Sequence, residues 1–212
     1  MMNPMNPTVN TWLSNALAMP FKATKHVHSN QDEVYRIETQ SATYYLKISR
    51  SLRAERDNLN KLGPILNVPE VIDFCDAQQD DYLLISELPG KNLVELIGVL
   101  PERTVVEKFA DAIRHLHSLD ATKVFPEAGP EDVLLHGDMA LPNIIGTDEG
   151  DVGYIDFGQL SFGSPELDLA DALWSLQRNL GPAYGELFLK KYGPVAITPT
   201  IKKALDYRHV DS

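Results

Sequence analysis

Apolar and polar residues alternate with the period of β-strands in the first part of this chain. In Ala42–Ser49 the side chains of Leu46 and Ile48 fall on one face and Lys47 falls on the other, and Glu33–Thr39 alternates in the same way. The polar E-T-Q-S between them predicts a hairpin turn. Two further strands and two helices are predicted before residue 89: strands Val71–Phe74 and Tyr82–Glu87, helices Trp12–Ala18 and Ser51–Leu62.

After Pro89-Gly90 the periodicity becomes helical. Arg103–Leu119 carries an apolar stripe at helical spacing, and Leu167–Leu180 and Tyr184–Tyr192 are predicted helices. Two short strands, Asn143–Gly146 and Val152–Asp156, read as a hairpin around T-D-E-G. The order of elements therefore predicts an α+β protein of two lobes with a cleft where they meet, residues 1–88 forming the first lobe and 89–212 the second.

Composition narrows the class of partner. The 212 residues carry a formal net charge of −11, which opposes binding to nucleic acid and suits a cationic small substrate, although solubility alone would also explain it. The single cysteine fits a reducing cytoplasm. No apolar run is long enough to cross a membrane, and the N-terminus does not resemble a secretory signal. The oligomeric state stays open.

The strongest chemical signal is H-G-D-M-A-L-P-N, followed by Y-I-D-F-G. Antiparallel pairing of the predicted hairpin brings Asn143, at the start of one strand, next to Asp156, at the end of the other. An amide oxygen and a carboxylate at one point suit Mg²⁺. Phosphoryl transfer needs such a metal site and a separate carboxylate that takes or orients the proton of the attacking hydroxyl, a role that Asp138 fits.

A second signal is the pair Lys47 and Glu55. Glu55 falls on the apolar stripe of its predicted helix, where an unpaired charge would be costly, so a lysine on a neighbouring strand is its natural partner. Kinases use such a pair to direct the lysine to the α- and β-phosphates of ATP. The stretch H-V-H-S-N-Q-D-E, where a glycine-rich phosphate loop would lie, contains no glycine. Backbone amides and the Ser29 hydroxyl are the groups predicted to meet the phosphates there.

Over residues 27–193 these motifs resemble the aminoglycoside phosphotransferase family, especially the 3'-phosphotransferases. H-G-D-x-x-x-P-N with I-D-x-G is similar to the family's catalytic and metal loops. S-P-E-L-D-L-A is similar to the helix that follows them, with Asp168 as the buried aspartate that braces the catalytic loop. The resemblance implies a kinase-like fold, with ATP and Mg²⁺ as cofactors.

The resemblance also implies a role for each matching residue. Asp138 would be the catalytic base, and Asn143 and Asp156 the magnesium ligands. V-Y-R-I is similar to the segment that sets an aromatic side chain against adenine, which points to Tyr35. L-L-I-S-E-L-P-G is similar to the hinge strand, so backbone groups of Ser86 and Leu88 would hold the adenine edge.

Three functions remain open from the sequence. The first is a kinase that phosphorylates a hydroxyl of an aminoglycoside-type antibiotic. The second is a kinase with another acceptor, a small metabolite or a protein, because the segments that complete the family's acceptor pocket are short here. The third is a non-catalytic nucleotide-binding relic.

Overall fold

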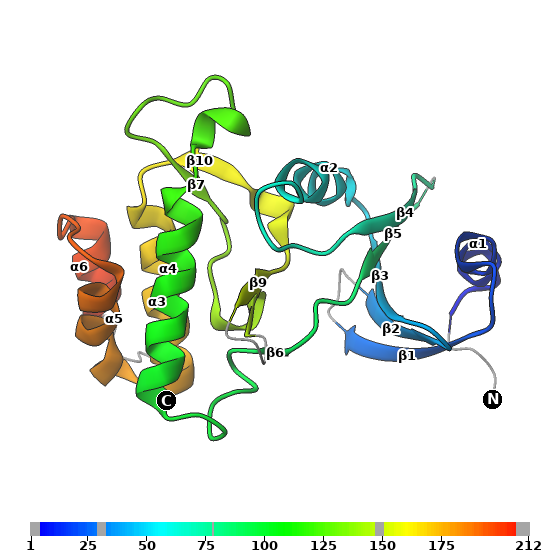
Figure 1. The fold of residues 1–212 in the computed structure, drawn as a ribbon, viewed down its shortest axis with the longest axis horizontal. Helices are drawn as coiled ribbons and strands as arrows, with labels where there is room; N and C mark the ends of the chain where they lie inside the picture. Colours follow the sequence, from blue (N-terminus) through cyan, green and yellow to red (C-terminus); the bar gives the residue numbers. More distant parts are fainter. Residues whose placement is uncertain (1–4, 29–32, 78, 147–150, 207–212) are drawn as a thin grey trace. The chain divides into compact units, whose positions relative to one another are not determined.

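The chain forms two compact units, Met1–Leu88 and Pro89–Ser212, in the computed structural model shown in Figure 1. The structure describes residues 5–28, 33–77, 79–146 and 151–206. Among these described residues, no helix has both the length and the apolar character needed to cross a bilayer.

Unit 1 is built on an antiparallel five-stranded sheet with the order β1-β2-β3-β5-β4. Alternation of side chains between the two faces gives each face a different role. On one face, Leu46 of β3 and Ile37 of β2 pack with helix α1 in a buried apolar cluster. Lys47 lies on the other face. The strands are β1 Phe21–His28, β2 Glu33–Thr39, β3 Thr43–Ser49, β4 Val71–Cys75 and β5 Asp81–Ser86, and the helices are α1 Pro7–Leu17 and α2 Arg53–Leu62.

Helix α1 begins earlier than the predicted Trp12. The Asn6 side chain accepts a hydrogen bond from the Thr8 N–H at 2.9 Å, and Pro7 occupies the first helical position, where its missing N–H costs nothing. Strand β1 was not predicted. Phe21 and Ala23 pack against the cluster under α1, but the lysine, threonine and histidine residues elsewhere in the strand hide the alternation.

Unit 2 is mostly helical. Helix α3 packs on α5, where the rings of Phe109 and Phe188 lie 5.7 Å apart, and α4 packs on α6. The helices are α3 Glu102–Ser118, α4 Glu166–Leu180, α5 Gly185–Tyr192 and α6 Pro199–Leu205, and the strands are β6 Lys91–Asn92, β7 Val133–Leu135, β8 Ile144–Gly146, β9 Val152–Tyr154 and β10 Ser161–Gly163. Helix α6 and the short strands β6, β7 and β10 were not predicted.

The predicted hairpin is present as β8 and β9, with Ile144 opposite Tyr154 and Gly146 opposite Val152. Both strands are shorter than predicted. Asn143 ends a 3₁₀ turn, Leu141–Asn143, and Asp156 lies two residues beyond β9. The difference arises because Pro142 favours the turn, and because Asp156 adopts a left-handed backbone conformation that ends the strand.

Candidate active site

The lysine–glutamate pair expected from the sequence is present in unit 1. Lys47 lies within β3 and Glu55 in the first turn of α2, and the Nζ and Oε1 atoms are 2.5 Å apart. Glu55 is 4% exposed and Lys47 is 17% exposed, so little water screens the pair. The ammonium group of Lys47 is therefore held in one place on its face of the sheet.

The structure corrects the prediction for Tyr35. In an antiparallel pair, residues directly opposite each other share a face, and Tyr35 lies opposite Leu46, whereas Lys47 lies opposite Val34. Tyr35 is 3% exposed and belongs to the apolar cluster under α1. Burial, with the hydrogen bond to Glu33, raises its pKa to about 12. Its ring is therefore part of the hydrophobic core, on the face of the sheet opposite Lys47. The prediction that Tyr35 contacts adenine is wrong.

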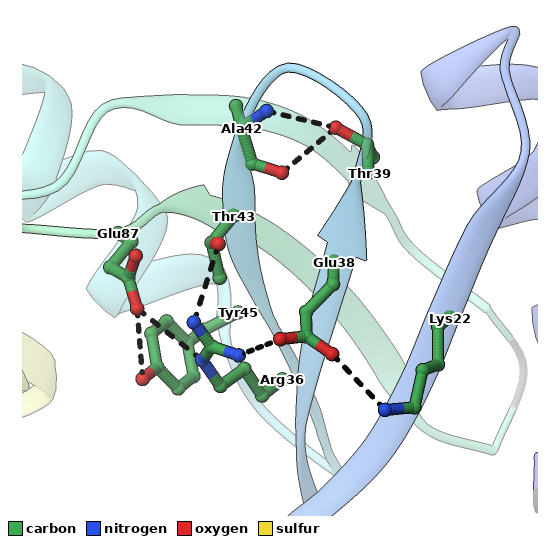
Figure 2. Close-up of polar contacts among 8 residues, drawn as sticks. All are labelled: Lys22, Arg36, Glu38, Thr39, Ala42, Thr43, Tyr45 and Glu87. Carbon is green, nitrogen blue, oxygen red and sulfur yellow. Dashed lines mark hydrogen bonds and ion pairs between the residues drawn. The ribbon is translucent and has the colours of Figure 1, made fainter.

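One aromatic side chain that shares the face of Lys47 is Tyr45, two residues earlier in β3. Figure 2 shows its surroundings: the Tyr45 hydroxyl donates to Glu87 Oε1 at 3.5 Å, and Arg36 Nε donates to the same oxygen at 3.4 Å. Arg36 also pairs with Glu38. Sequence analysis assigned Tyr45 no place in the site. The strand alternation that separates Lys47 from Leu46 was the signal that could have found it.

The hinge residues Ser86 and Leu88 lie at the end of β5. The Ser86 N–H donates to the Glu70 carbonyl at 2.9 Å, and the Ser86 hydroxyl accepts from the Glu70 N–H at 2.9 Å. The Ser86 N–H is therefore engaged with the segment before β4. Leu88 is the last residue of unit 1. Ser29, predicted to meet the phosphates, lies outside the described residues.

In unit 2, Asp168 of α4 holds the loop that follows β7. This fully buried carboxylate accepts hydrogen bonds from the His136 N–H at 2.8 Å and the Gly137 N–H at 3.0 Å. It also lies 3.1 Å from Nε2 of His117 on α3. Two backbone donors and an imidazole thus satisfy a charge that burial alone would make costly. The geometry is the one that the resemblance implies for this residue.

His136 and Gly137 fix the course of the same loop. The His136 ring lies between the Ile155 carbonyl, 2.9 Å from Nε2, and the Asp138 N–H, 3.3 Å from Nδ1. Burial lowers the pKa of His136 and favours a neutral ring that donates from Nε2 and accepts at Nδ1. Gly137 has φ 82°, and a Cβ there would lie 2.3 Å from the Gln159 carbonyl oxygen. Only glycine fits at this position.

Asp138 and Asn143 are in direct contact. The Asn143 amide nitrogen donates to the Asp138 carbonyl at 2.8 Å and to the Asp138 carboxylate at 3.2 Å. Asn143 is buried, whereas Asp138 is exposed. The asparagine amide nitrogen therefore orients a carboxylate that faces solvent.

Asp156 reaches the neighbourhood of Asn143 through the hairpin. The Asn143 carbonyl accepts from the Ile155 N–H at 3.0 Å, so the backbone next to Asp156 is tied to Asn143 itself. Asp156 is exposed and has φ 71° and ψ 50°, a left-handed conformation that aspartate tolerates better than most residues. The structure thus brings together three of the predicted residues, Asp138, Asn143 and Asp156, around one loop.

The donor set fits Mg²⁺ better than a softer metal. Asn143 and Asp156 offer an amide oxygen and a carboxylate, both hard oxygen donors. Across the described residues, no group of three or more His, Cys, Asp or Glu side chains could hold a metal ion by itself. A site with two protein ligands matches the usual coordination of Mg²⁺, which takes its remaining ligands from water and substrate phosphates.

Sequence comparison gives this chain clear relatives. It matches the model of the phosphotransferase enzyme family, APH, over residues 23–133 and 124–203. A probable aminoglycoside 3'-phosphotransferase of Lactococcus lactis is 40% identical over 202 residues, covering 71% of this chain and 75% of the relative. An aminoglycoside 3'-phosphotransferase of Niallia circulans is 25% identical over 243 residues, covering 89% of this chain and 93% of the relative.

Solved structures agree on the fold. An aminoglycoside-3'-phosphotransferase of type VIII has a TM-score of 0.72 at 18% identity, covering 93% of this chain and 97% of that chain. The phosphotransferase APH(3'')-Id of Streptomyces rimosus, solved with ADP and streptomycin, has a TM-score of 0.70 at 20% identity, covering 94% and 97%. These neighbours confirm the predicted α+β, kinase-like fold class. On the strength of the family match and these relatives, the chain belongs to the phosphotransferase enzyme family and is an enzyme of the aminoglycoside phosphotransferase type.

Proposed function

We propose that this enzyme transfers the γ-phosphoryl group of ATP to a hydroxyl group of an aminoglycoside-type antibiotic in a Mg²⁺-dependent reaction. The observation that carries the proposal is the exposed Asp138 carboxylate, held by Asn143 on a loop braced by Asp168. The relatives' names supply the acceptor class, since one of them is 40% identical to this chain. The second possibility, a different hydroxyl-bearing acceptor, uses the same residues.

Residues 1–88 would form the nucleotide-binding lobe. The Lys47 ammonium, fixed by Glu55, would contact the α- and β-phosphates. The Ser86 carbonyl and the backbone of Leu88 would hold the adenine edge. Because Tyr45 shares the face of Lys47, we assign it the place against adenine that the sequence suggested for Tyr35. The Ser29 hydroxyl remains a predicted phosphate contact.

Residues 89–212 would form the catalytic lobe. Asn143 and Asp156 would hold Mg²⁺, which neutralises charge on the phosphates when it is bound. Asp138 would accept a hydrogen bond from the acceptor hydroxyl and align its oxygen with the γ-phosphorus. A new bond then forms between that oxygen and phosphorus, the bond from phosphorus to the β,γ-bridging oxygen breaks, ADP leaves, and the hydroxyl proton passes to Asp138. Positioning and charge complementarity would supply most of the acceleration.

The acceptor would be a small molecule and not a nucleic acid, because a net charge of −11 repels phosphate backbones and attracts cations. A cytoplasmic location would provide ATP, and the single cysteine fits a reducing compartment.

The test is ADP release from ATP, with and without Mg²⁺, against kanamycin- and neomycin-type aminoglycosides, amino alcohols and sugars. Asp138→Asn serves as the blank. We expect an aminoglycoside to stimulate release, and Asp138→Asn to lower turnover by roughly 10²–10⁴-fold while the ATP dissociation constant is unchanged.

Each result has a defined meaning. Stimulation by a sugar or amino alcohol alone would keep the phosphotransferase and replace its acceptor. ATP binding without release on any acceptor would overturn the proposal in favour of a nucleotide-binding relic. Near-normal turnover in Asp138→Asn would remove the role proposed for Asp138.

A further inference from the structure

A chain of hydrogen bonds runs from helix α5 to the loop that carries Asp138. The hydroxyl of Tyr192, the last residue of α5, lies 2.9 Å from Nδ1 of His117 on α3. Nε2 of the same ring lies 3.1 Å from Oδ2 of Asp168 on α4. That oxygen also accepts the hydrogen bond from the His136 N–H, at 2.8 Å. Side chains of three helices are therefore connected to the catalytic loop.

The middle of this chain is closed to water. The Asp168 side chain is fully buried, and the His117 side chain is 3% exposed. The rings of Tyr192 and His117 meet edge to face, with their centroids 5.8 Å apart and their planes at 81°. Because water is excluded, each nitrogen of the imidazole depends on the protein group that it faces.

The two neighbours of His117 determine where its proton lies. Nε2 faces a carboxylate oxygen of Asp168, which can only accept, so Nε2 carries a proton. On a neutral ring Nδ1 is then an acceptor that needs a donor. Burial, followed by the negative charge of Asp168, raises the pKa of Tyr192, so its hydroxyl keeps the proton that it donates to Nδ1. Tyr192 thus completes the hydrogen bonds of the ring and fixes its plane.

A second tyrosine–histidine pair in unit 2 has the opposite direction. The Tyr154 hydroxyl donates to the Ala112 carbonyl at 2.8 Å, so it accepts from Nδ1 of His115, 3.2 Å away. Among the described residues, no backbone carbonyl accepts from the Tyr192 hydroxyl in this way. A tyrosine that donates to a histidine is therefore particular to the pair that contacts Asp168.

The His117 N–H restrains the Asp168 carboxylate where its orientation matters. Each oxygen of this carboxylate serves one backbone donor of the loop, Oδ2 that of His136 and Oδ1 that of Gly137, at 3.0 Å. Rotation of the carboxylate would lengthen both bonds, and the additional donor at Oδ2 opposes that rotation. Asp138 follows Gly137 directly in the chain, so a shift of the loop would displace it, and small displacements of an aligning group are costly in rate.

We propose that Tyr192 is a positioning residue for phosphoryl transfer. Its hydroxyl holds the His117 ring, and that ring keeps the Asp168 carboxylate in the orientation that the catalytic loop needs. The inference rests on the proposed function, in which Asp138 aligns the acceptor hydroxyl. Tyr192 itself touches neither substrate.

The test compares wild type with Tyr192→Phe, which removes only the hydroxyl. Tyr184→Phe is the matched control, because the Tyr184 hydroxyl also makes a hydrogen bond, to Glu102, but lies outside the chain that leads to Asp168. Turnover is measured with ATP and a kanamycin-type aminoglycoside. We expect Tyr192→Phe to lower kcat roughly 3–10-fold, the effect of losing one neutral hydrogen bond, and to change each KM by less than about twofold. Tyr184→Phe should match wild type, and an equal loss of kcat in both variants would overturn the inference.

Nitrogen-15 NMR of the histidine rings measures the state of His117 without turnover, and His117→Phe identifies its signals. In wild type Nε2 should be protonated and Nδ1 unprotonated. In Tyr192→Phe the Nε2 proton should exchange with solvent roughly 3–10-fold faster, because the ring has lost one of its two restraints. A wild-type ring protonated at Nδ1, or an unchanged exchange rate in Tyr192→Phe, would overturn the inference.

A double-variant cycle tests the route through His117. In a His117→Phe background, Tyr192→Phe should change kcat by less than about 1.5-fold, because the connection to Asp168 is already broken. The same loss of kcat in both backgrounds would exclude this route. If wild type phosphorylates none of the acceptors, the proposed function fails. Faster exchange of the His136 and Gly137 amide protons in Tyr192→Phe would then still support the hold of Tyr192 on the loop.

Discussion

Three aspartates of unit 2 show how strongly the surroundings of a side chain determine its task. Asp168 is fully buried and fully hydrogen-bonded, so its charge holds a loop in place. Asp138 is exposed and contacts a single side-chain amide, so its free lone pairs face solvent. Asp171 is exposed as well, but its carboxylate is partly desolvated and has two other carboxylates nearby.

The environment of Asp171 predicts a stability change with a definite sign. Its folded-state pKa of about 6 lies above the ordinary 3.8, so the folded state binds the proton more tightly than the unfolded state. The stability from this residue is fully present below pH 3.8 and is lost as the pH rises through 6. Asp171→Asn should therefore be more stable than wild type at pH 8 by about 1 kcal/mol, after allowance for solvent screening.

Thermal unfolding of both proteins at pH 4 and pH 8 measures this difference. Wild type and Asp171→Asn should unfold at similar temperatures at pH 4 and separate at pH 8, whereas Glu186→Gln, the same change in charge at an exposed position of α5, should follow wild type throughout. If the unfolding temperatures of wild type and Asp171→Asn differed by the same amount at pH 4 and pH 8, packing, and not ionisation, would distinguish the two proteins.

At the level of the element, strands β2 and β3 show that the face of the sheet on which a side chain lies decides whether it belongs to the core or lies beside Lys47. Tyr35 and Tyr45 lie on neighbouring strands and are both tyrosines, yet they lie on opposite faces of the sheet. Tyr35 fills the space under α1, and Tyr45 lies on the side of Lys47. The resemblance between short motifs pointed to an aromatic residue but did not consider on which face of the sheet its side chain lies. For that reason it selected the wrong tyrosine.

The two tyrosines make a matched pair of variants. Tyr35→Ala should lower the free energy of unfolding by about 3–5 kcal/mol, because it opens a cavity in the core. Tyr45→Ala should cost much less stability and should raise the KM for ATP roughly 10-fold through the lost ring contact. Urea denaturation and steady-state kinetics measure the two effects. The reverse outcome, a nucleotide defect confined to Tyr35→Ala, would restore the original assignment.

The pair that joins β3 to α2 allows stability and nucleotide binding to be separated. Lys47→Met leaves the buried Glu55 without its lysine and should cost about 3–5 kcal/mol of stability. The double variant Lys47→Met/Glu55→Leu replaces both charges with apolar groups and should recover most of that loss. It should still bind ATP far more weakly than wild type. Recovery of ATP affinity together with stability would exclude a direct phosphate contact by Lys47.

On the scale of the whole molecule, the sequence predicts the fold class, the ion pair of Lys47 with Glu55 and the β8–β9 hairpin. The long periodic segments, such as Arg103–Leu119, appear as helices with nearly the predicted bounds. The catalytic motif is informative because its polar residues are close in sequence and a hairpin brings them together. Strand β1 was missed because polar residues hide its alternation, and the short helix α6 was missed because tertiary packing, and not a local pattern, stabilises it.

The course of the Asp138 loop depends on long-range contacts that the sequence does not reveal. The loop is held by hydrogen bonds between segments more than thirty residues apart in the chain, Asp168 with Gly137 and Ser175 with Leu141. In the sequence, Ser175 is one more polar residue of a predicted helix.

The net charge of the chain predicts how salt affects the enzyme. A charge of −11 raises the local concentration of a polycationic acceptor, and added salt screens that attraction. The KM for a multiply charged aminoglycoside should therefore rise several-fold, on the order of 3–10-fold, between 20 and 200 mM potassium chloride. An uncharged acceptor should show little change. Equal salt dependence for both acceptors would place the effect on the nucleotide or the fold.

The two ties between helix α4 and the Asp138 loop also limit how this enzyme can diversify. The loop spans a fixed distance between Asp168 and Ser175, so inserting or deleting a residue within it would release one tie and displace Asp138. The exposed side chains of α4 have no such restriction, because they can change while the backbone of the helix stays in place. Selection would then act by substitution at exposed positions, with the catalytic loop kept at constant length.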